Sequence, residues 1–491
     1  MRTCNAPSGF PSRVAADVAG AAMAHQVLDA DYLVVGAGAT GMAFVDTLLT
    51  ESDASVVMVD RRHAPGGHWL DAYPFVQLHM ESASYGVASR ELGAAVQRTG
   101  PEAGMHERAS AHQICAYYAA VMQEQFLSSG RVEFFPACDY LGRGHFVSLV
   151  SADTTFEVRV RHRIVDATYL ASEIPSRTPP RFAVEVGARC VPVNELATLT
   201  TAPEGFVIIG AGKTAMDACT WLMSQGVDPD AITWVRPRDA WINNRRFFEG
   251  GALLAGLVQG VAYMFQAAAE ADTLDEALLR LEDFGVIRRL DAAVQPTMCK
   301  IPTVADWELE QLRRVRNVVR LGHVRSIGQR EVVLDGGTIP TSPNHLHVHC
   351  TASGVRPRSP VPVFRPRAIT IQALRAGLPY YGAAVTAYVE AHRTDDTEKN
   401  RLCAPNPYPD DPISWARCWA ASAAHDRILG AEPDIAAWLQ SLRLNISRDI
   451  TTRSREPEIS QARQRLRDWA APGHAKLTAF ASNPGGPGAS W

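Results

Sequence analysis

Two glycine-rich turns are the parts of this sequence whose residue types and spacing can do chemistry. Gly36-Ala-Gly-Ala-Thr-Gly41 follows an apolar run at residues 32–35, and Gly210-Ala-Gly-Lys-Thr-Ala215 follows another at 206–209. Both match Gly-x-Gly-x-x-Gly/Ala between a strand and a helix, the arrangement that binds a dinucleotide diphosphate at a helix N-terminus. Two copies predict two dinucleotides and electrons passing from one to the other.

The first turn is followed by an acid at the expected distance. Gly36 permits the tight turn, Gly38 lets the backbone approach a diphosphate, and Gly41 lets the helix expected at 42–50 pack closely on the strand. The strand expected at 55–60 ends in Asp60, 19 residues after Gly41, as for the acid that holds ribose hydroxyls. The alternative is a strand–turn–helix that binds no nucleotide.

The second turn differs at its third glycine, which is Ala215, and at the end of its second strand. That strand, expected at 231–236, ends in Arg236 instead of an acid. A guanidinium can pair with a 2′-phosphate that a carboxylate would repel, so Arg236 predicts NADPH over NADH, with Arg238 or Lys213 as helpers. The alternative is a solvated strand end.

Composition limits the class of protein. At 491 residues the chain predicts two or three domains, and a net charge of −4 without a basic run gives no sign of a nucleic-acid partner. Nine cysteines form no Cys-x-x-Cys pair, which argues against a disulfide-reductase centre and a structural zinc site. Their odd number and scattered spacing suit reduced thiols in the cytoplasm.

Two segments between the expected elements need separate interpretation. Residues 239–303 form an insertion too long for a simple connection, which predicts a functional or lid-like role. Residues 250–269 carry no charge and are as long as a membrane span. Their glutamines and early glycines favour a buried or pocket-lining helix over membrane contact.

Further motifs carry a family resemblance. Gly66-Gly-His-Trp69 follows the ribose acid, Tyr73-Pro74 and Leu78-His-Met-Glu-Ser-Ala-Ser-Tyr85 come next, and Cys350-Thr-Ala-Ser-Gly354 lies far downstream. With the two turns, this pattern resembles the class B flavoprotein monooxygenases, which include flavin-containing and Baeyer–Villiger monooxygenases. The resemblance assigns residues to the two cofactors. FAD would be bound by Gly36, Gly38, Gly41, Asp60, Gly67, His68, Trp69 and Gly354, and NADPH by Gly210, Gly212, Ala215 and Arg236.

The resemblance implies a monooxygenase. NADPH would reduce FAD, O₂ would form a peroxyflavin, and one oxygen atom would enter a small apolar organic substrate. The family fingerprint Phe-x-Gly-x-x-x-His is effectively absent, since Glu185 and Val191 flank Gly187 at its Phe and His positions. An NADPH:FAD reductase without oxygen transfer is therefore the first alternative. A non-enzymatic nucleotide-binding redox sensor or scaffold is the second.

Histidines offer the remaining candidates. His79 stands where Baeyer–Villiger enzymes place an acid, so it either serves catalysis by holding a hydrogen bond or a proton, or bonds a loop carbonyl. His345, His347 and His349 share one face of an expected strand. Their ~7 Å spacing, without a completing carboxylate or cysteine, argues against a metal site.

The expected fold is α/β, with two doubly wound dinucleotide-binding, Rossmann-like domains and a helical C-terminal region. The FAD domain is expected to be discontinuous, with the NADPH domain inserted into it. The predicted divisions are a disordered leader at 1–29, FAD domain at 30–175 and 341–382, NADPH domain at 176–340, helices at 383–482, and a disordered tail at 483–491.

Overall fold

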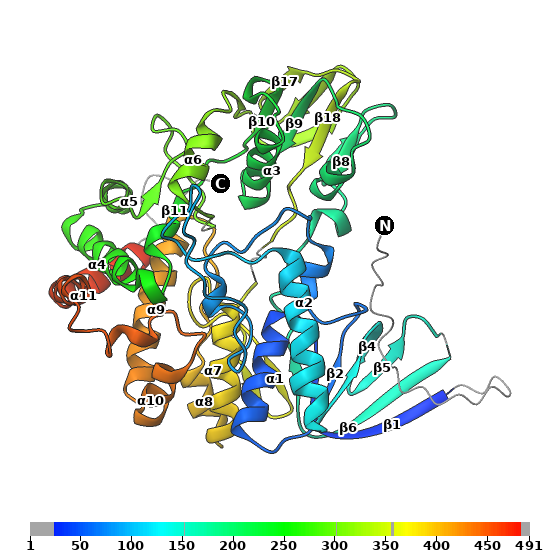
Figure 1. Cartoon of the computed structure of the whole chain (residues 1–491), viewed down its shortest axis with the longest axis vertical. Coiled ribbons are helices and arrows are strands. Elements are labelled where there is room, and N and C mark those ends of the chain that lie inside the picture. Colours follow the sequence, from blue (N-terminus) through cyan, green and yellow to red (C-terminus); the bar gives the residue numbers. More distant parts are fainter. Residues whose placement is uncertain (1–23, 152, 301, 355–357, 483–491) are drawn as a thin grey trace.

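Two parallel β-sheets, each with its own helices, form the frame of the protein (Figure 1). The computed structural model describes residues 24–151, 153–300, 302–354 and 358–482. We call the part built on the first sheet the first unit and the part built on the second sheet the second unit. The expected α/β class with two Rossmann-like domains is confirmed.

The first sheet has the order β19-β20-β6-β1-β2-β3, and the hairpin β4–β5 pairs with β6. Strands β20, β6, β1, β2 and β3 are parallel. Its strands are β1 (Ala24–Val35), β2 (Val56–Val59), β3 (Val132–Phe135), β4 (Cys138–Gly142), β5 (His145–Ser148), β6 (Thr154–Asp166), β19 (Phe364–Arg365) and β20 (Ala368–Thr370).

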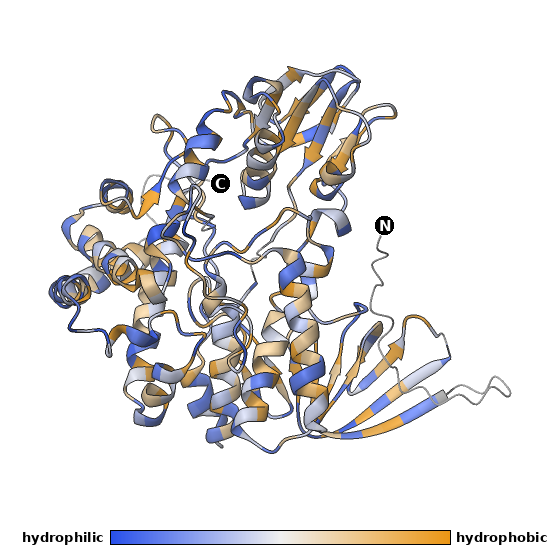
Figure 2. Cartoon of the chain, viewed as in Figure 1, coloured by the Kyte–Doolittle hydropathy of each residue, from blue (hydrophilic) through white to orange (hydrophobic). Residues whose placement is uncertain are grey.

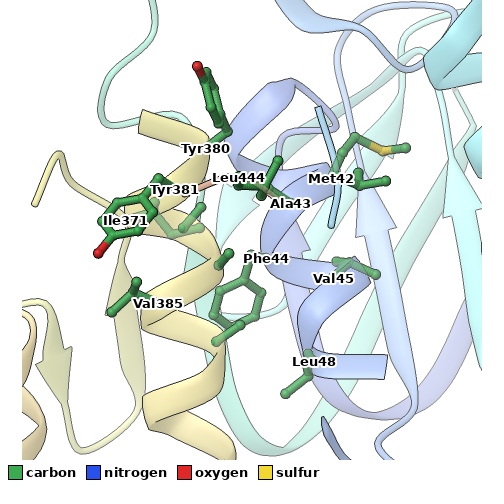
Figure 3. Close-up of a cluster of buried hydrophobic side chains, with 14 of the residues drawn as sticks. Met42, Ala43, Phe44, Val45, Leu48, Ile371, Tyr380, Tyr381, Val385 and Leu444 are labelled. Atoms are coloured by element: carbon green, nitrogen blue, oxygen red, sulfur yellow. The ribbon is translucent and has the colours of Figure 1, made fainter. Parts of the chain in front are cut away.

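Three helices bury one face of this sheet, namely α1 (Ala39–Glu51), α2 (Ala111–Val121) and α7 (Pro379–His392). α1 and α7 lie side by side, with Phe44 and Val385 in the buried cluster between them (Figure 3). Because each such apolar side chain contributes roughly 1.5–3 kcal/mol on burial, α7 is an integral part of the first unit. The first unit is therefore discontinuous in sequence, as expected.

The opposite face of the first sheet is covered by antiparallel strands. Phe146 of β5 and Phe156 of β6 stack with ring centroids 4.5 Å apart and pack with Leu33 and Val57. β6 continues without a break as far as Asp166.

The prediction of a disordered leader at 1–29 is wrong for its last six residues. Residues 24–29 form the first half of β1 and pair with residues 154–159 of β6. The backbone N–H and C=O groups of a strand need partners, and the projecting part of β6 provides them. The rest of the expected leader, 1–23, and the expected tail, 483–491, lie outside the described residues.

The second sheet has the order β14-β10-β9-β18-β8 and is parallel throughout. Its strands are β8 (Cys190–Pro192), β9 (Gly205–Ile209), β10 (Ile232–Val235), β14 (Asn317–Val319) and β18 (His345–His349). Helices α3 (Lys213–Ser224) and α6 (Asp306–Arg313) pack together beside it. The adjacent strands β9 and β10 are largely hydrophobic (Figure 2).

A four-stranded sheet, of order β17-β16-β15-β7, packs its apolar side chains against the second sheet. Its strands are β7 (Ala183–Val184), β15 (Val324–Ile327), β16 (Glu331–Leu334) and β17 (Gly337–Pro340).

The position of β18 corrects one domain boundary. The chain was expected to return to the first unit near residue 345, but β18 pairs with β9 and β8 inside the second sheet. An apolar strand pattern indicates burial without specifying which sheet the strand joins. The second part of the first unit therefore begins after Gly354, and the predicted boundary at 341 is wrong.

The two passages of the chain between the units run next to each other. The Glu173 N–H donates to the Ser353 carbonyl oxygen at 3.0 Å, and the Ser353 N–H donates to the Glu173 carboxylate at 3.1 Å. The first passage follows β6, and the second follows β18. The units are thus joined by two neighbouring passages of the chain, at Glu173 and Ser353, which we call the doubled connection.

The insertion contributes two helices and a small sheet, built from β11 (Ile242–Asn244), α4 (Leu254–Glu270), α5 (Leu274–Asp283), β12 (Ile287–Arg288) and β13 (Thr303–Val304). Residues 251–270 are long and apolar enough to cross a membrane by length and composition, and half of the most apolar window is buried inside the protein. α4 packs along α11 (Pro457–Ser482), where Gly473 meets the Phe265 backbone. The helix is therefore partly buried against the C-terminal region, and the absence of membrane contact stays a prediction.

The C-terminal region is helical, as expected. Its helices after α7 are α8 (Asp396–Leu402), α9 (Pro412–Gly430), α10 (Pro433–Ser441) and α11. The loop after α10 reaches the first unit, where the guanidinium of the half-buried Arg443 donates to the carbonyl oxygens of Ala83, Tyr85 and Val87. The C-terminal region therefore fixes the loop that carries Tyr85.

Candidate dinucleotide sites and the groups between them

The first glycine turn has the geometry of a dinucleotide-binding turn. Gly36 has a φ of 104°, in the region that favours glycine, and a Cβ on Gly41 would collide with the Gly36 carbonyl oxygen. α1 begins directly after Gly38, and no side chain caps its first N–H groups. These donors and the helix dipole suit a diphosphate.

Asp60 lies beside this turn, directly after β2. Its carboxylate accepts hydrogen bonds from the backbone N–H groups of Ala37 at 2.6 Å and Arg62 at 2.8 Å. Burial raises the pKa of Asp60, and these two donors oppose that shift. The carboxylate is therefore held in place by backbone of the first unit itself.

The Gly-Gly-His-Trp motif packs directly on the first turn. A Cβ on Gly67 would lie 2.8 Å from the Gly38 Cα, so the two backbones meet at glycine. Trp69 donates from Nε1 to the Tyr85 hydroxyl at 2.6 Å and packs against the cores of both units. Burial lowers the pKa of His68 to about 4, so this ring is neutral near pH 7.

The second glycine turn is similar in backbone but more open. Gly210 has a φ of 134°, and a Cβ there would lie 2.8 Å from the Cys350 carbonyl oxygen. No described atom lies within 4 Å of a Cβ built on Gly212, which precedes α3. Ala215 is fully buried, and its methyl group fits the place where the first turn requires Gly41.

Arg236 follows β10 and is buried. It faces the Asp239 carboxylate, with Nη1 3.3 Å from Oδ1, and lies over the Trp234 ring at 4.9 Å. A second guanidinium shares this acid, because Arg320 Nε donates to Asp239 Oδ2 at 2.8 Å. Sequence reasoning missed Arg320, although it directly follows β14, the strand next to β10.

The two residues expected to help Arg236 have other partners. Lys213 Nζ is buried and pairs with Asp217, and it lies 3.5 Å from Glu308. Arg238 pairs with Asp410 at 2.9 Å. Lys213 therefore belongs to the junction between the units.

His79 lies at that junction. Tyr73, six residues earlier, is buried in the core of the second unit and donates from its hydroxyl to Asp217 on α3 at 2.6 Å. His79 itself is exposed to solvent, yet enough protein surrounds it that desolvation, with the charge of Lys213, lowers its pKa to about 4. The imidazole is therefore neutral near pH 7.

A buried network of charges continues from Lys213 across the junction. Arg108 of the first unit pairs with Glu102 and lies 3.4 Å from Glu308. Glu102 accepts from Arg245 of the insertion at 2.6 Å, and Arg245 also pairs with Glu249. Burial opposes ionisation of Glu308, but Lys213 and Arg108 together lower its pKa to about 2.

Glu81 is an acid of this region for which the described residues provide no cationic partner. Its Oε1 accepts from the Ser84 hydroxyl at 2.7 Å and from the Gly250 N–H at 3.3 Å, and its Oε2 accepts from none of the described residues. Burial raises its pKa to about 7. Tyr380 and Tyr85, with ring centroids 5.0 Å apart, connect this acid to Trp69.

Among the strand histidines, His347 has both ring nitrogens in hydrogen bonds. His347 Nδ1 lies 2.9 Å from the Arg189 carbonyl oxygen and must donate to it, so Nε2 accepts from the Thr341 hydroxyl at 2.9 Å. His347 thus has no free lone pair for a metal. Gly354, assigned to FAD by resemblance, is exposed at the second passage between the units.

The departures from the family fingerprint lie away from the turns. The Glu185 N–H donates to the Ile327 carbonyl oxygen beside β7, and Gly187 has a φ of 90°. Val191 sits within β8 and pairs with Val348.

These features together define a protein with two dinucleotide-type units that meet over a charged junction. Residues 34–81 match the family model described as NAD(P)-binding Rossmann-like domain. "Uncharacterized protein Rv2000" of Mycobacterium tuberculosis is 43% identical over 449 residues, which cover 90% of this chain and 83% of that protein. The chain belongs to the same family as this mycobacterial protein.

Among solved structures, the chain is similar to a flavin-containing monooxygenase from Stenotrophomonas maltophilia. The identity is 15%, the TM-score 0.41, and the coverage 77% of this chain and 100% of that one. It is also similar to cyclohexanone monooxygenase from Rhodococcus sp. Phi1 bound to NADP+, at 15% identity and a TM-score of 0.44, covering 77% and 89%.

Proposed function

We propose that the protein is an FAD- and NADPH-dependent monooxygenase that transfers one oxygen atom of O₂ to a small apolar organic molecule. The observation that carries the proposal is the junction. The segment that follows the Gly-Gly-His-Trp motif packs through Tyr73 on α3, the helix of the second glycine turn. This arrangement supports direct transfer of reducing equivalents, because two dinucleotides bound at the turns would converge there.

The residues present fit both cofactors. The first unit offers an uncapped helix start after Gly38 and an acid, Asp60, held beside it for ribose hydroxyls. The second unit offers open space at Gly212 and two guanidiniums, Arg236 and Arg320, at neighbouring strand ends. We assign FAD to the first set and NADPH to the second.

Bound flavin would supply the redox chemistry and the activation of O₂. The side chains around the flavin would orient it and exclude water from it. Trp69 and Tyr85, locked by their hydrogen bond and by the Arg443 clamp on the Tyr85 carbonyl, form a rigid aromatic wall. His79 is neutral near pH 7, so one ring nitrogen could donate a hydrogen bond to a bound group and the other could accept one.

A reductase that transfers no oxygen is the second candidate. It is favoured by the loss of the Phe-x-Gly-x-x-x-His fingerprint, where Glu185 and Val191 form backbone contacts of β-structure instead. His79 in place of an acid points the same way.

The test measures which product contains the oxygen atoms of O₂. The full chain is loaded with FAD and given NADPH, ¹⁸O₂, and a panel containing a cyclic ketone and a thioether. We expect ¹⁸O in a product in proportion to the NADPH consumed. If all oxygen appears as hydrogen peroxide with every panel member, the protein is a reductase. If the chain cannot be loaded with FAD, the non-enzymatic alternative holds.

A matched pair of variants tests the cofactor assignment. Gly67→Ala places a methyl group against the Gly38 backbone, so it is expected to reduce FAD loading and leave NADP⁺ binding intact. Gly212→Val is expected to do the reverse. Equal effects of both variants on both cofactors would contradict the assignment.

A further inference from the structure

A carboxylate occupies the space between two arginines at neighbouring strand ends of the second sheet. Asp239 is 8% exposed and Arg236 is 3% exposed. Asp239 Oδ1 lies 3.3 Å from Arg236 Nη1, and Oδ2 accepts from Arg320 Nε at 2.8 Å. One negative charge is thus shared by two guanidiniums.

The three side chains of this cluster lie at the carboxyl edge of the second sheet. β10 and β14 are adjacent and parallel, so Arg236 and Arg320 leave the sheet at the same carboxyl edge, where a doubly wound sheet binds the ribose of its nucleotide. Arg236 is held over the Trp234 ring, and its Nε has no hydrogen-bond partner among the described residues. Two fixed guanidiniums with unused donors suit an anion with more oxygens than one carboxylate.

Asp239 comes from the start of the insertion. Its backbone carbonyl oxygen accepts from the N–H groups of Thr297 and Met298, both at 3.2 Å, which closes the base of the insertion. The Asp239 backbone is therefore anchored, while its side chain is paired, among the described residues, with the two arginines. Rotation of that side chain alone would release Arg236 and Nε of Arg320, whose Nη2 would keep its contact with Asp291 at 3.0 Å.

We propose that Asp239 is a tethered anion that competes with the 2′-phosphate of NADP(H) for Arg236 and Arg320. The inference rests on the proposed function only in that the second unit binds a nicotinamide dinucleotide. A 2′-phosphate carries up to two negative charges and displaces the single carboxylate, which turns away from the guanidiniums. Because that displacement subtracts from the binding free energy, Asp239 limits the preference for NADP(H) over NAD(H).

The test uses two small probes that differ only by the 2′-phosphate. The full chain and its variants are titrated with 2′,5′-ADP and with 5′-AMP by calorimetry. In Asp239→Asn we expect the affinity for 2′,5′-ADP to rise on the order of tenfold, and the affinity for 5′-AMP to stay the same. An unchanged or lower affinity ratio between the probes overturns the proposal, since Asp239 would then only position the arginines.

Three further variants test the role of Asp239 with the same two probes. Asp239→Ser, which removes the charge but keeps a small polar group, should shift the ratio in the same direction if Asp239→Asn does not fold. Arg320→Gln should weaken 2′,5′-ADP about tenfold without affecting 5′-AMP. Asp291→Asn is the matched control, because Asp291 contacts Arg320 from the exposed side at 3.0 Å. A control shift as large as that of Asp239→Asn contradicts the proposal.

Failure of the proposed function would look different. A wild-type chain that binds neither 5′-AMP nor 2′,5′-ADP has no nucleotide site in its second unit, which contradicts the proposed function and this inference together. A chain that binds both probes while Asp239 variants leave their ratio unchanged contradicts this inference alone.

Discussion

The two units use the same turn but stabilise the charge at the end of the next strand in different ways. Asp60 of the first unit accepts two backbone N–H groups from its own surroundings. Arg236 of the second unit depends on Asp239, a side chain at the start of the insertion. The first site is therefore complete within its unit, whereas the second is shaped by a neighbouring segment. The two glycine-rich motifs are alike, but the sites built on them differ in how far they depend on neighbouring segments.

The strongest test of this comparison lies where the insertion reaches the first unit. Arg245 is fully buried and pairs with Glu102 of the first unit and with Glu249. Arg245→Met leaves both carboxylates without their shared cation, so we expect the free energy of unfolding to fall by about 3–5 kcal/mol. Urea unfolding followed by circular dichroism measures it.

The control for this change is Arg238→Met. Arg238 and its partner Asp410 are both partly exposed, so the expected loss is below about 1 kcal/mol. Similar losses for the two variants would show that the insertion contributes no more to the first unit than a surface pair does.

The two turns themselves provide the next test. Gly41→Ala forces a methyl group against the Gly36 carbonyl oxygen, so we expect it to lower the free energy of unfolding by about 1–3 kcal/mol. Gly212→Ala enters open space, and its effect should stay below about 1 kcal/mol. Thermal unfolding of the two variants side by side measures the difference, and a reversed order would refute the view that the first turn is the tighter one.

The dependence of stability on pH sharpens the comparison at the junction. Burial raises the pKa of Glu81 from 4.5 to about 7, so between these values the folded protein holds a proton that the unfolded chain releases. The contribution of Glu81 to stability therefore falls by about 1.4 kcal/mol per pH unit from roughly pH 4.5 to 7, and is constant above. We expect Glu81→Gln to remove this fall.

The measurement compares the unfolding free energies of wild type and Glu81→Gln at pH 5, 6, 7 and 8. Glu91→Gln, which changes an exposed carboxylate of the same unit, serves as control. Parallel curves for wild type and Glu81→Gln would mean that Glu81 is ionised in the folded protein throughout this range.

The smallest expected effect concerns the aromatic wall of the first unit. Trp69→Phe and Tyr85→Phe each break the hydrogen bond between the indole Nε1 and the phenol, at a cost of about 1 kcal/mol. The double variant should cost about the same as either single one, because only one bond is lost. Strictly additive losses would show that the two rings act independently.

The two dinucleotide-binding turns could be predicted from the sequence because their residues lie close together along the chain. The glycines, the following helices and Asp60 lie within about 30 residues of one another, and the strand and helix periodicities are read over similar distances. The helical C-terminal region and the burial of α4 were predictable for the same reason.

Long-range pairing was not predictable. The alternation of β18 indicated a strand but not its sheet, and residues 24–29 gave no sign that β6 would project far enough to pair with them. Arg320 could have been found from its place after a strand, had β14 been known to neighbour β10. The network from Lys213 to Glu249 joins residues far apart in sequence, whose charges carry no local signal.

The doubled connection between the units has a mechanical consequence. A single linker would allow one unit to swivel freely about the bond directions of the chain. Two neighbouring passages joined by the Glu173 and Ser353 hydrogen bonds are expected to resist twisting of one unit against the other more than a single linker would. We therefore expect any relative movement of the two sheets to be mainly a bend at this connection, which would change the distance between the two glycine turns.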